Sequence, residues 1–301
     1  MRGGCGRARR GAVALVPLLL TGLVGASALQ GCEAAERARG ADSVLALFAP
    51  PDPLTAARWA IDPYDPDRRY EGTLLLANSP FGGGDVYVLL YEDNAGDENP
   101  NVRAAGVRGL ANHGNPGHVP LLVERLRDES RAVRLEAARA LQRLHNPVAV
   151  DPLLDVAVLG RGNEGEPDVR AEAAHALGQY AVDRVAFGLV EAMADPDLVV
   201  NRNAVRSLRT LTGQDFGYSR AAWSGWLANQ ASASRFAQRR RYIFPVFYRE
   251  PRFVERLPFV PPPPNESAST PVGFPPLTSD AFDRPGEGAP ERRGSRGGGR
   301  Q

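Results

Sequence analysis

The sequence predicts an all-α chain whose central part is an α-solenoid built from stacked helix pairs. Three observations predict it: a short segment recurs at intervals of about 31 residues, apolar residues within each copy follow the helical period, and proline often marks the expected helix starts. The chain has 301 residues, of which 43% are apolar, so a core of this size can be formed.

Four segments align without gaps, at residues 102–110, 133–141, 169–177 and 200–208, with starts 31, 36 and 31 residues apart. A weaker fifth copy begins 34 residues before the first of them. In the second copy Val133, Ala137, Ala140 and Leu141 fall on one stripe of a helix. The fifth position is Gly or Ala in every copy, so we expect neighbouring helices to approach closely. We therefore predict about five repeats over residues 59–230.

Helix starts are marked by a capping side chain before proline. The pairs are Asp65-Pro66, Asn99-Pro100 and Asp195-Pro196, with Glu166-Pro167 as a weaker match. The longer 36-residue interval comes from an insertion at residues 160–165, for which we expect a flexible loop. After the last copy, the large side chains of Trp223 and Trp226 predict a C-terminal cap that closes the stack.

The opening VRxxAxxAL of the segment 133–141 and the proline between the two helices resemble HEAT repeats of the short bacterial kind, also found in relatives of phycobilisome lyases. The resemblance covers roughly residues 60–228. It implies a protein-binding solenoid fold and is nearly silent about activity. HEAT-repeat iron hydroxylases carry His-Glu pairs, and none of the histidines here, His113, His118, His145 and His175, is followed by Glu. We expect no metal site and no cofactor.

The N-terminus has the features of a bacterial lipoprotein signal. Four arginines precede residue 11, residues 11–28 carry no charge, and Leu29-Gln30-Gly31-Cys32 resembles a lipobox. We predict a signal peptide at 1–31, lipidation of Cys32, and a linker at 32–58. An ordinary cleaved signal and an uncut anchor are the alternatives. The implied location is the cell envelope, facing the periplasm, and Glu33 in place of an aspartate favours the outer membrane.

One arginine recurs near the start of the first helix in four of the five copies, at Arg69, Arg103, Arg134 and Arg170. We call this set the arginine ladder. It either faces an anionic partner or bonds carboxylates and carbonyls of adjacent repeats. Its position just before the small core residues favours the structural role.

Charge and aromatic residues set the C-terminal region apart. Residues 33–230 hold 20 arginines and 28 acids, whereas 231–260 hold seven arginines and two acids. We predict that 231–260 is an extended basic-aromatic strap packed near Trp223 and Trp226; membrane or partner contact is the alternative, and predicted export argues against nucleic acid. The candidate contact residues are Arg239, Arg240, Arg241, Tyr242, Phe244, Phe247 and Tyr248. The Pro- and Gly-rich residues 261–301 are predicted to be disordered.

No catalytic constellation stands out in the sequence, so we expect a non-enzymatic scaffold. Its expected partners are an unidentified protein or peptide and the membrane, through the lipid anchor. We expect no nucleic acid and no small-molecule substrate. The alternative function is a lyase-like or chaperone-like assistant of an enzyme on the same fold.

Lipidation is testable at one atom, because the Cys32 thiol is the expected attachment point of the lipid. Cys32→Ala should give a larger precursor that takes up no fatty-acid probe during metabolic labelling. Cys5→Ala is the matched control and should leave labelling intact, since Cys5 lies in the segment to be removed. A wild-type chain that takes up no label contradicts the prediction.

Overall fold

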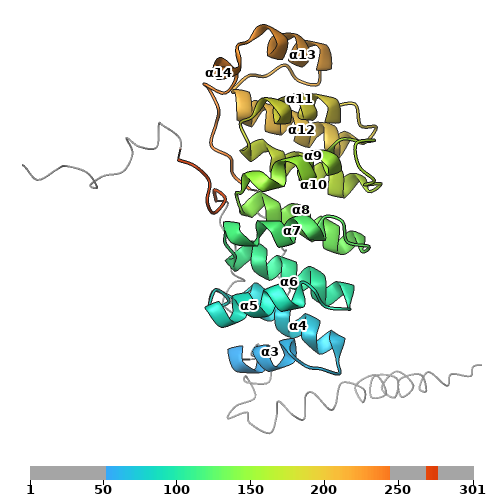
Figure 1. Ribbon diagram of the computed structural model, residues 1–301, viewed down its shortest axis with the longest axis vertical. Helices are drawn as coiled ribbons and strands as arrows, with labels where there is room; N and C mark the ends of the chain where they lie inside the picture. Colours follow the sequence, from blue (N-terminus) through green and yellow to red (C-terminus); the bar gives the residue numbers. More distant parts are fainter. Residues whose placement is uncertain (1–51, 245–268, 277–301) are drawn as a thin grey trace, which may run out of the picture. The chain divides into compact units, whose positions relative to one another are not determined.

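The computed structural model describes residues 52–244 and 269–276 of the chain. Within these residues the regular elements are helices, with one isolated β-bridge between Leu144 and Val272. Figure 1 shows the helix pairs stacked on one another in chain order. The predicted all-α solenoid is confirmed.

Each repeat consists of a first helix and a second helix. The first helices are α4 (Pro66–Ala77), α6 (Pro100–His113), α8 (Arg131–Arg143), α10 (Pro167–Ala176) and α12 (Leu198–Thr212). The second helices are α5 (Asp85–Asn94), α7 (Val119–Arg125), α9 (Val150–Ala157), α11 (Asp183–Ala192) and α13 (Arg220–Asn229). Short 3-10 turns lie between the helices of the middle repeats: η2 (Pro116–His118), η3 (Pro147–Ala149) and η4 (Leu177–Gln179). The short helix α14 (Ser232–Arg235) follows the last repeat.

An additional helix, α3 (Pro53–Ala60), lies in front of the first repeat. It packs tightly on α4, because a Cβ atom added to Gly72 would lie only 2.4 Å from the backbone oxygen of Ala56. Ala60 is fully buried in the same contact layer. The prediction of a linker through residue 58 is therefore wrong from Pro53 onward, where apolar residues of α3 join the core.

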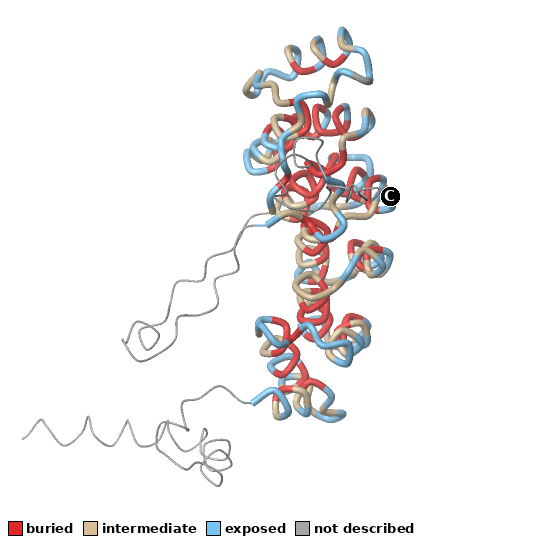
Figure 2. The backbone as a smooth tube through the Cα atoms, turned by 90° about the vertical axis from the view of Figure 1, so that its left-hand side faces the viewer, coloured by how far each residue is buried: buried red, intermediate tan, exposed pale blue. Residues whose placement is uncertain are grey.

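The core follows the small-residue stripe of the first helices, drawn as the buried part of the tube in Figure 2. The predicted stripe of α8 is buried throughout: Val133, Ala137, Ala140 and Leu141 are each 0% exposed. The fifth position is small because the backbones nearly touch there. A Cβ on Gly106 would lie 2.5 Å from the backbone nitrogen of Ala95. Close packing of this kind leaves little room for a larger side chain.

The caps follow the predictions at two helices and differ at a third. Asp65 and Asn99 accept backbone N–H bonds at the starts of α4 and α6. The predicted Asp195 cap is wrong, because α12 begins two residues after Pro196 and Asp197 caps it instead. The Asp195 carboxylate is engaged by the guanidinium of Arg170.

The last helix pair closes the stack through aromatic packing. Trp223 and Leu227 on α13 are fully buried, and the Phe216 ring meets Trp223 edge-on at 4.9 Å between ring centroids. The turn before α13 begins at Gly213, whose left-handed backbone ends α12.

The register of the repeat is testable at Leu141, which is fully buried at the end of the α8 stripe. Leu141→Ala should lower the free energy of unfolding by about 2–5 kcal/mol, because it leaves a cavity in the core. Leu198→Ala is the control, since Leu198 is 78% exposed on α12, and it should change stability by less than about 0.5 kcal/mol. Denaturant unfolding measures both, and equal effects would contradict the register.

Candidate functional site

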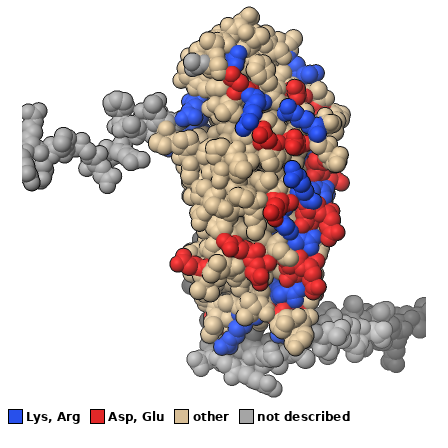
Figure 3. Space-filling view, viewed as in Figure 1, with Lys and Arg blue, Asp and Glu red and all other residues tan. Residues whose placement is uncertain are grey.

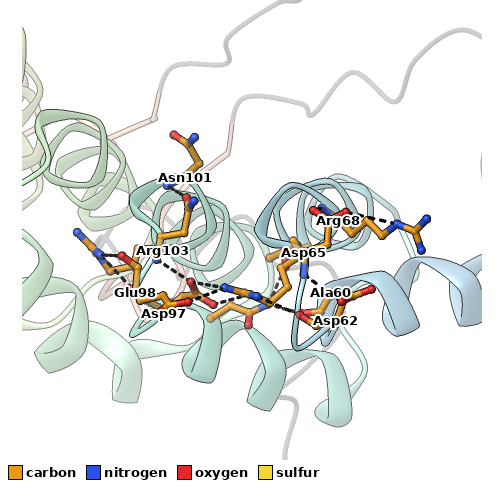
Figure 4. A network of polar contacts seen from close by, with 12 residues as sticks. Ala60, Asp62, Asp65, Arg68, Asp97, Glu98, Asn101 and Arg103 are labelled. Atoms are coloured by element: carbon orange, nitrogen blue, oxygen red, sulfur yellow. Dashed lines mark hydrogen bonds and ion pairs between the residues drawn. The ribbon is translucent and has the colours of Figure 1, made fainter. Parts of the chain in front are cut away.

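The arginine ladder forms one repeated contact along the starts of the first helices. We call each arginine of the ladder, with the groups that it contacts, a rung. In each rung the guanidinium donates hydrogen bonds to the loop before its own helix and to the loop before the next first helix. Arg103 shows the pattern: its Nε and Nη2 donate to the Asp128 carboxylate at 2.9 and 2.8 Å, and its Nη1 donates to the backbone oxygens of Asp97 and Glu98. Figure 4 shows Arg103 beside Asp97 and Glu98, whose backbone oxygens it contacts. The fork geometry suits a planar guanidinium and a carboxylate.

The other rungs use the same atoms with different acids. Arg69 pairs with Asp97, Arg134 with Glu164, and Arg170 with Asp195, each through Nε and Nη2. Each acid also accepts the backbone N–H two residues further along the chain, as Asp128 does from Ser130 at 2.9 Å. One carboxylate therefore fixes both an arginine and the turn that leads into the next helix.

The insertion at residues 160–165 is part of this ladder. It supplies Glu164, whose side chain is 4% exposed and receives Arg134 Nε at 2.6 Å. Arg170 in turn donates to the Gly165 oxygen at 2.8 Å. The C-terminal end of the predicted flexible loop is thus held by two arginines. Glu166 makes no side-chain capping bond, since this turn is held by Glu164 instead.

Burial and charge both place the ladder inside the stack. Arg170 and Asp195 have side chains that are 5% and 0% exposed. Burial opposes ionisation of Asp128, yet its bonds with Arg103 and with the Ser130 N–H hold the pKa of that carboxyl below its usual value. The hydrogen bond to Asp128 raises the pKa of the Arg103 guanidinium. These contacts use the guanidinium N–H groups that an anionic partner would otherwise bind.

Charged side chains gather along one long edge of the face drawn in Figure 3, and much of the rest of that face carries few charges.

The ladder ends at the fifth repeat, where Asn201 replaces the arginine. Its Nδ2 donates to the Asp195 oxygen at 2.9 Å, which reproduces the backbone contact without the carboxylate fork.

The opposite ends of the first helices carry a different structure. After α14 the chain runs back beside the stack, as the orange segment in Figure 1 shows. Arg240 N–H donates to the Thr210 oxygen of α12 at 2.7 Å, Tyr242 packs beside Gly178, and Phe244 lies under the Arg143 guanidinium at 4.9 Å. We call the C-terminal ends of α8, α10 and α12, with the turns after them and the turn at Pro116, the strap edge.

Tyr242 is the anchor of this segment, at 3% exposure. Its hydroxyl oxygen lies 2.8 Å from Nδ1 of His175, and their ring centroids are 5.3 Å apart. Burial lowers the pKa of His175 to about 4, so the ring is neutral near pH 7. Its Nδ1 can then accept a hydrogen bond from the Tyr242 hydroxyl. Burial also raises the pKa of Tyr242 well above its usual value.

The strap therefore extends further than the sequence indicated. The sequence predicts a position on the C-terminal repeats near Trp223 and Trp226, whereas Tyr242 contacts His175 of α10 and Phe244 reaches Arg143 of α8. At the start of the segment, Phe236 packs against the core. The physical reason for the difference is that Phe216 already packs against both tryptophans, at 4.9 and 6.0 Å between ring centroids.

The remaining predicted contact residues have mixed positions. Arg239 is half-buried, Arg240 and Arg241 are exposed, and Phe247 and Tyr248 lie outside the described residues. The strap's ion pair with the acidic stack comes from Arg235, which meets Asp183 at 2.7 Å.

Residues 269–276 also lie on the strap edge, although disorder was predicted from residue 261. Ser269 accepts the Phe244 N–H at 3.1 Å, so the two described segments adjoin. Val272 then forms the bridge with Leu144, and Pro271 is buried. The prediction of disorder is wrong for this segment, because helix ends offer it backbone partners that composition does not reveal.

The histidines contact other residues of the stack. His118 Nε2 lies 2.8 Å from a Glu92 oxygen, and His113 Nε2 lies 3.0 Å from the Ala77 oxygen. The carboxylate beside His118 comes from α5, because the turn between His113 and His118 contains no acidic residue. Among residues 52–244 and 269–276, no group of three or more His, Cys, Asp or Glu side chains could hold a metal ion.

Sequence patterns missed His175 as a strap contact. Its position in the repeat is arginine in the neighbouring copies, at Arg108, Arg139 and Arg206. The replacement of a long charged side chain by a flat neutral ring is the signal that could have marked it. His145, with Gln179 and Tyr180, was also missed, because these three residues meet only through the fold.

Comparison with known proteins agrees with the repeat architecture. Residues 92–164 match the family model of HEAT repeats. The complex of CpcE and CpcF of phycocyanin lyase from Nostoc sp. PCC7120 is 20% identical, with a TM-score of 0.46 and coverage of 62% of this chain and 71% of that one. A designed armadillo repeat protein is 16% identical, with a TM-score of 0.41 and coverage of 62% and 96%. No match was found among curated proteins.

The described part of the chain holds no helix whose length and apolar character would let it cross a membrane. Cys32 and the predicted signal peptide lie outside the described residues.

The structural role of the ladder is testable by comparing a buried rung with an exposed ion pair. Arg170→Ala leaves the fully buried Asp195 carboxylate without its partner, so the free energy of unfolding should fall by about 3–5 kcal/mol. Arg131→Ala removes an ion pair whose arginine is 56% exposed and should cost about 1 kcal/mol or less. Both are measured by denaturant unfolding; similar small losses would mean that the ladder does not hold the stack.

Proposed function

We propose that this chain is a lipid-anchored scaffold of the bacterial cell envelope and that its helix-repeat stack binds a protein partner through the strap edge. The anchor would be the acylated Cys32, with the stack facing the periplasm and the outer membrane favoured. In this proposal the chain brings its partner to the membrane surface and performs no chemistry itself.

One observation carries the proposal of protein binding: the strap edge already holds two non-helical segments of polypeptide. Residues 240–244 and 269–274 lie along it, using backbone oxygens at the ends of α12 and α8 as acceptors. The last turns of a helix leave carbonyl groups without partners in the helix itself. A row of such helix ends is therefore suited to extended chains, whose own backbone supplies the missing donors.

The chemistry of the strap edge supports binding in preference to catalysis. His175 is buried and His145 is half-buried, and burial lowers the pKa of both. His175 contacts the Tyr242 hydroxyl, and His145 contacts Gln179 and stacks on Tyr180 at 4.8 Å. Each ring is held by neighbours inside the protein, which favours a positioning role over proton transfer to a substrate.

The binding edge is testable by photo-crosslinking in the producing cells. A photoreactive residue would replace Val148 or Val182, which are 53% and 40% exposed in the turns after α8 and η4. Both positions should capture the same protein, because both lie on the strap edge. Val199, 44% exposed at the start of α12, is the matched control at the opposite edge and should capture none of it.

Capture of the same protein from all three positions would contradict the assignment of the strap edge. Failure of both Val148 and Val182 to capture any protein would contradict the scaffold proposal itself.

A further inference from the structure

Residues 269–274 bind the strap edge through backbone groups at the end of α8. His145 N–H donates to the Val272 oxygen at 2.9 Å, and Val272 N–H donates to the Arg143 oxygen at 2.8 Å. Arg143 O belongs to the last turn of α8, and His145 follows the end of that helix. The short segment therefore satisfies one acceptor and one donor at a helix end, as an added β-strand does at a sheet edge.

The side chains of this segment are buried to different extents against the strap edge. Pro271 is buried, and its ring carries no N–H that burial would leave unsatisfied. Val272 is 53% exposed, so its side chain is barely used. Phe274 is half-buried and meets the His145 ring edge-on at 5.6 Å. The surface thus selects residues on both sides of Val272 and tolerates change at Val272 itself.

Gly273 is required at its position for two reasons. Its φ of 81° lies in the left-handed region, which side chains with a Cβ rarely adopt. A Cβ added there would lie 2.6 Å from Cγ of Pro116 and 3.2 Å from the His145 oxygen. Any residue larger than glycine would push the segment away from the stack.

From this geometry we propose that the part of the strap edge formed by Pro116, Arg143 and His145 is a recognition site for a Pro-x-Gly-aromatic turn of a partner protein. The chain's own Pro271–Phe274 segment, whose Phe274 N–H donates to the Pro271 oxygen at 3.1 Å, occupies the site in the absence of that partner. This inference deepens the proposed function and rests on it for the idea that the stack binds protein. It adds the chemistry of the ligand and the backbone contacts that receive it.

The contacts are few enough to be exchanged. The segment makes two backbone hydrogen bonds to the α8 end, buries one proline and half-buries one ring. It is joined to the neighbouring Phe244 through residues 245–268, so the chain's own copy competes with any partner as a tethered ligand. Tethering by a linker of this kind gives an effective concentration of about millimolar. A partner segment must bind better than that competitor to replace it.

The test uses the purified full-length chain and a fluorescent synthetic peptide with the sequence of residues 269–276. Gly273→Val in the chain should release the chain's own segment and leave the site intact. The variant should then bind the peptide about tenfold or more tightly than the wild type, because the tethered competitor is gone. Val272→Ala is the matched control and should bind the peptide as weakly as the wild type does.

A second measurement reports on the site directly. The His145 amide hydrogen should exchange faster in Gly273→Val, since its acceptor on Val272 has left, and addition of the peptide should slow that exchange again. A peptide carrying the same Gly-to-Val change should do neither. Circular dichroism and thermal unfolding of the variant check that the stack remains folded.

Equal and weak peptide binding by the wild type and by Gly273→Val would overturn the proposal, as would His145 exchange that the peptide does not change. A concentration-dependent wild-type dimer that disappears in Gly273→Val would assign the site to a second copy of the chain and would likewise overturn it. The assay needs neither the lipid anchor nor the cellular partner. Its failure would therefore leave the crosslinking test of the scaffold proposal unaffected.

Discussion

The fork between one arginine and one carboxylate, present in the first four repeats, is the contact on which the rest of the structure depends. Each guanidinium joins two consecutive inter-repeat loops, and each carboxylate also fixes the turn into the next first helix. The first helices are thereby held side by side, and α6 lies so close to the end of α5 that Gly106 has no room for a Cβ atom. The same constraint aligns the far ends of these helices, and that alignment creates the strap edge.

The two long edges of the stack consequently differ in character. At the edge where the first helices begin, charged groups neutralise one another within the protein. At the edge where they end, backbone oxygens of Thr210 and Arg143 are met by other parts of the chain. We expect recognition at the second edge because its partners are peptide groups, which another chain can supply equally well.

Much of the repeat could be predicted from the sequence because its determinants are local and repeated. One helical stripe contains Val133, Ala137 and Leu141, and the same spacing returns in each copy. A wrong helix assignment based on one copy would therefore be revealed by comparison with the next. The cap of α12 could not be assigned in this way. Asp195 precedes a proline as a cap should, but the bond that decides its role comes from Arg170, 25 residues earlier.

The strap and its continuation were harder to place for a related reason. Tyr242 meets His175 across 67 residues of chain, and this contact occurs once, so no period reveals it. Composition correctly marked aromatic residues that need cover, but it could not say which helix end covers them. Pro271 and Gly273 lie in a region whose composition indicates disorder, and only the free backbone groups of α8 give them a place.

A linear array of repeats ordinarily couples each unit only to its neighbours, so its ends can fray without disturbing the middle. The strap changes this connectivity. It leaves the last repeat and crosses the ends of α12 and α10, and residues 269–276 then contact α8 and the turn at Pro116. The stability of one repeat therefore depends on contacts made with repeats that are not its neighbours. Opening at the C-terminal end must then break links deep in the array. The described stack should therefore unfold more nearly as one cooperative body than the one-dimensional design of its repeats implies.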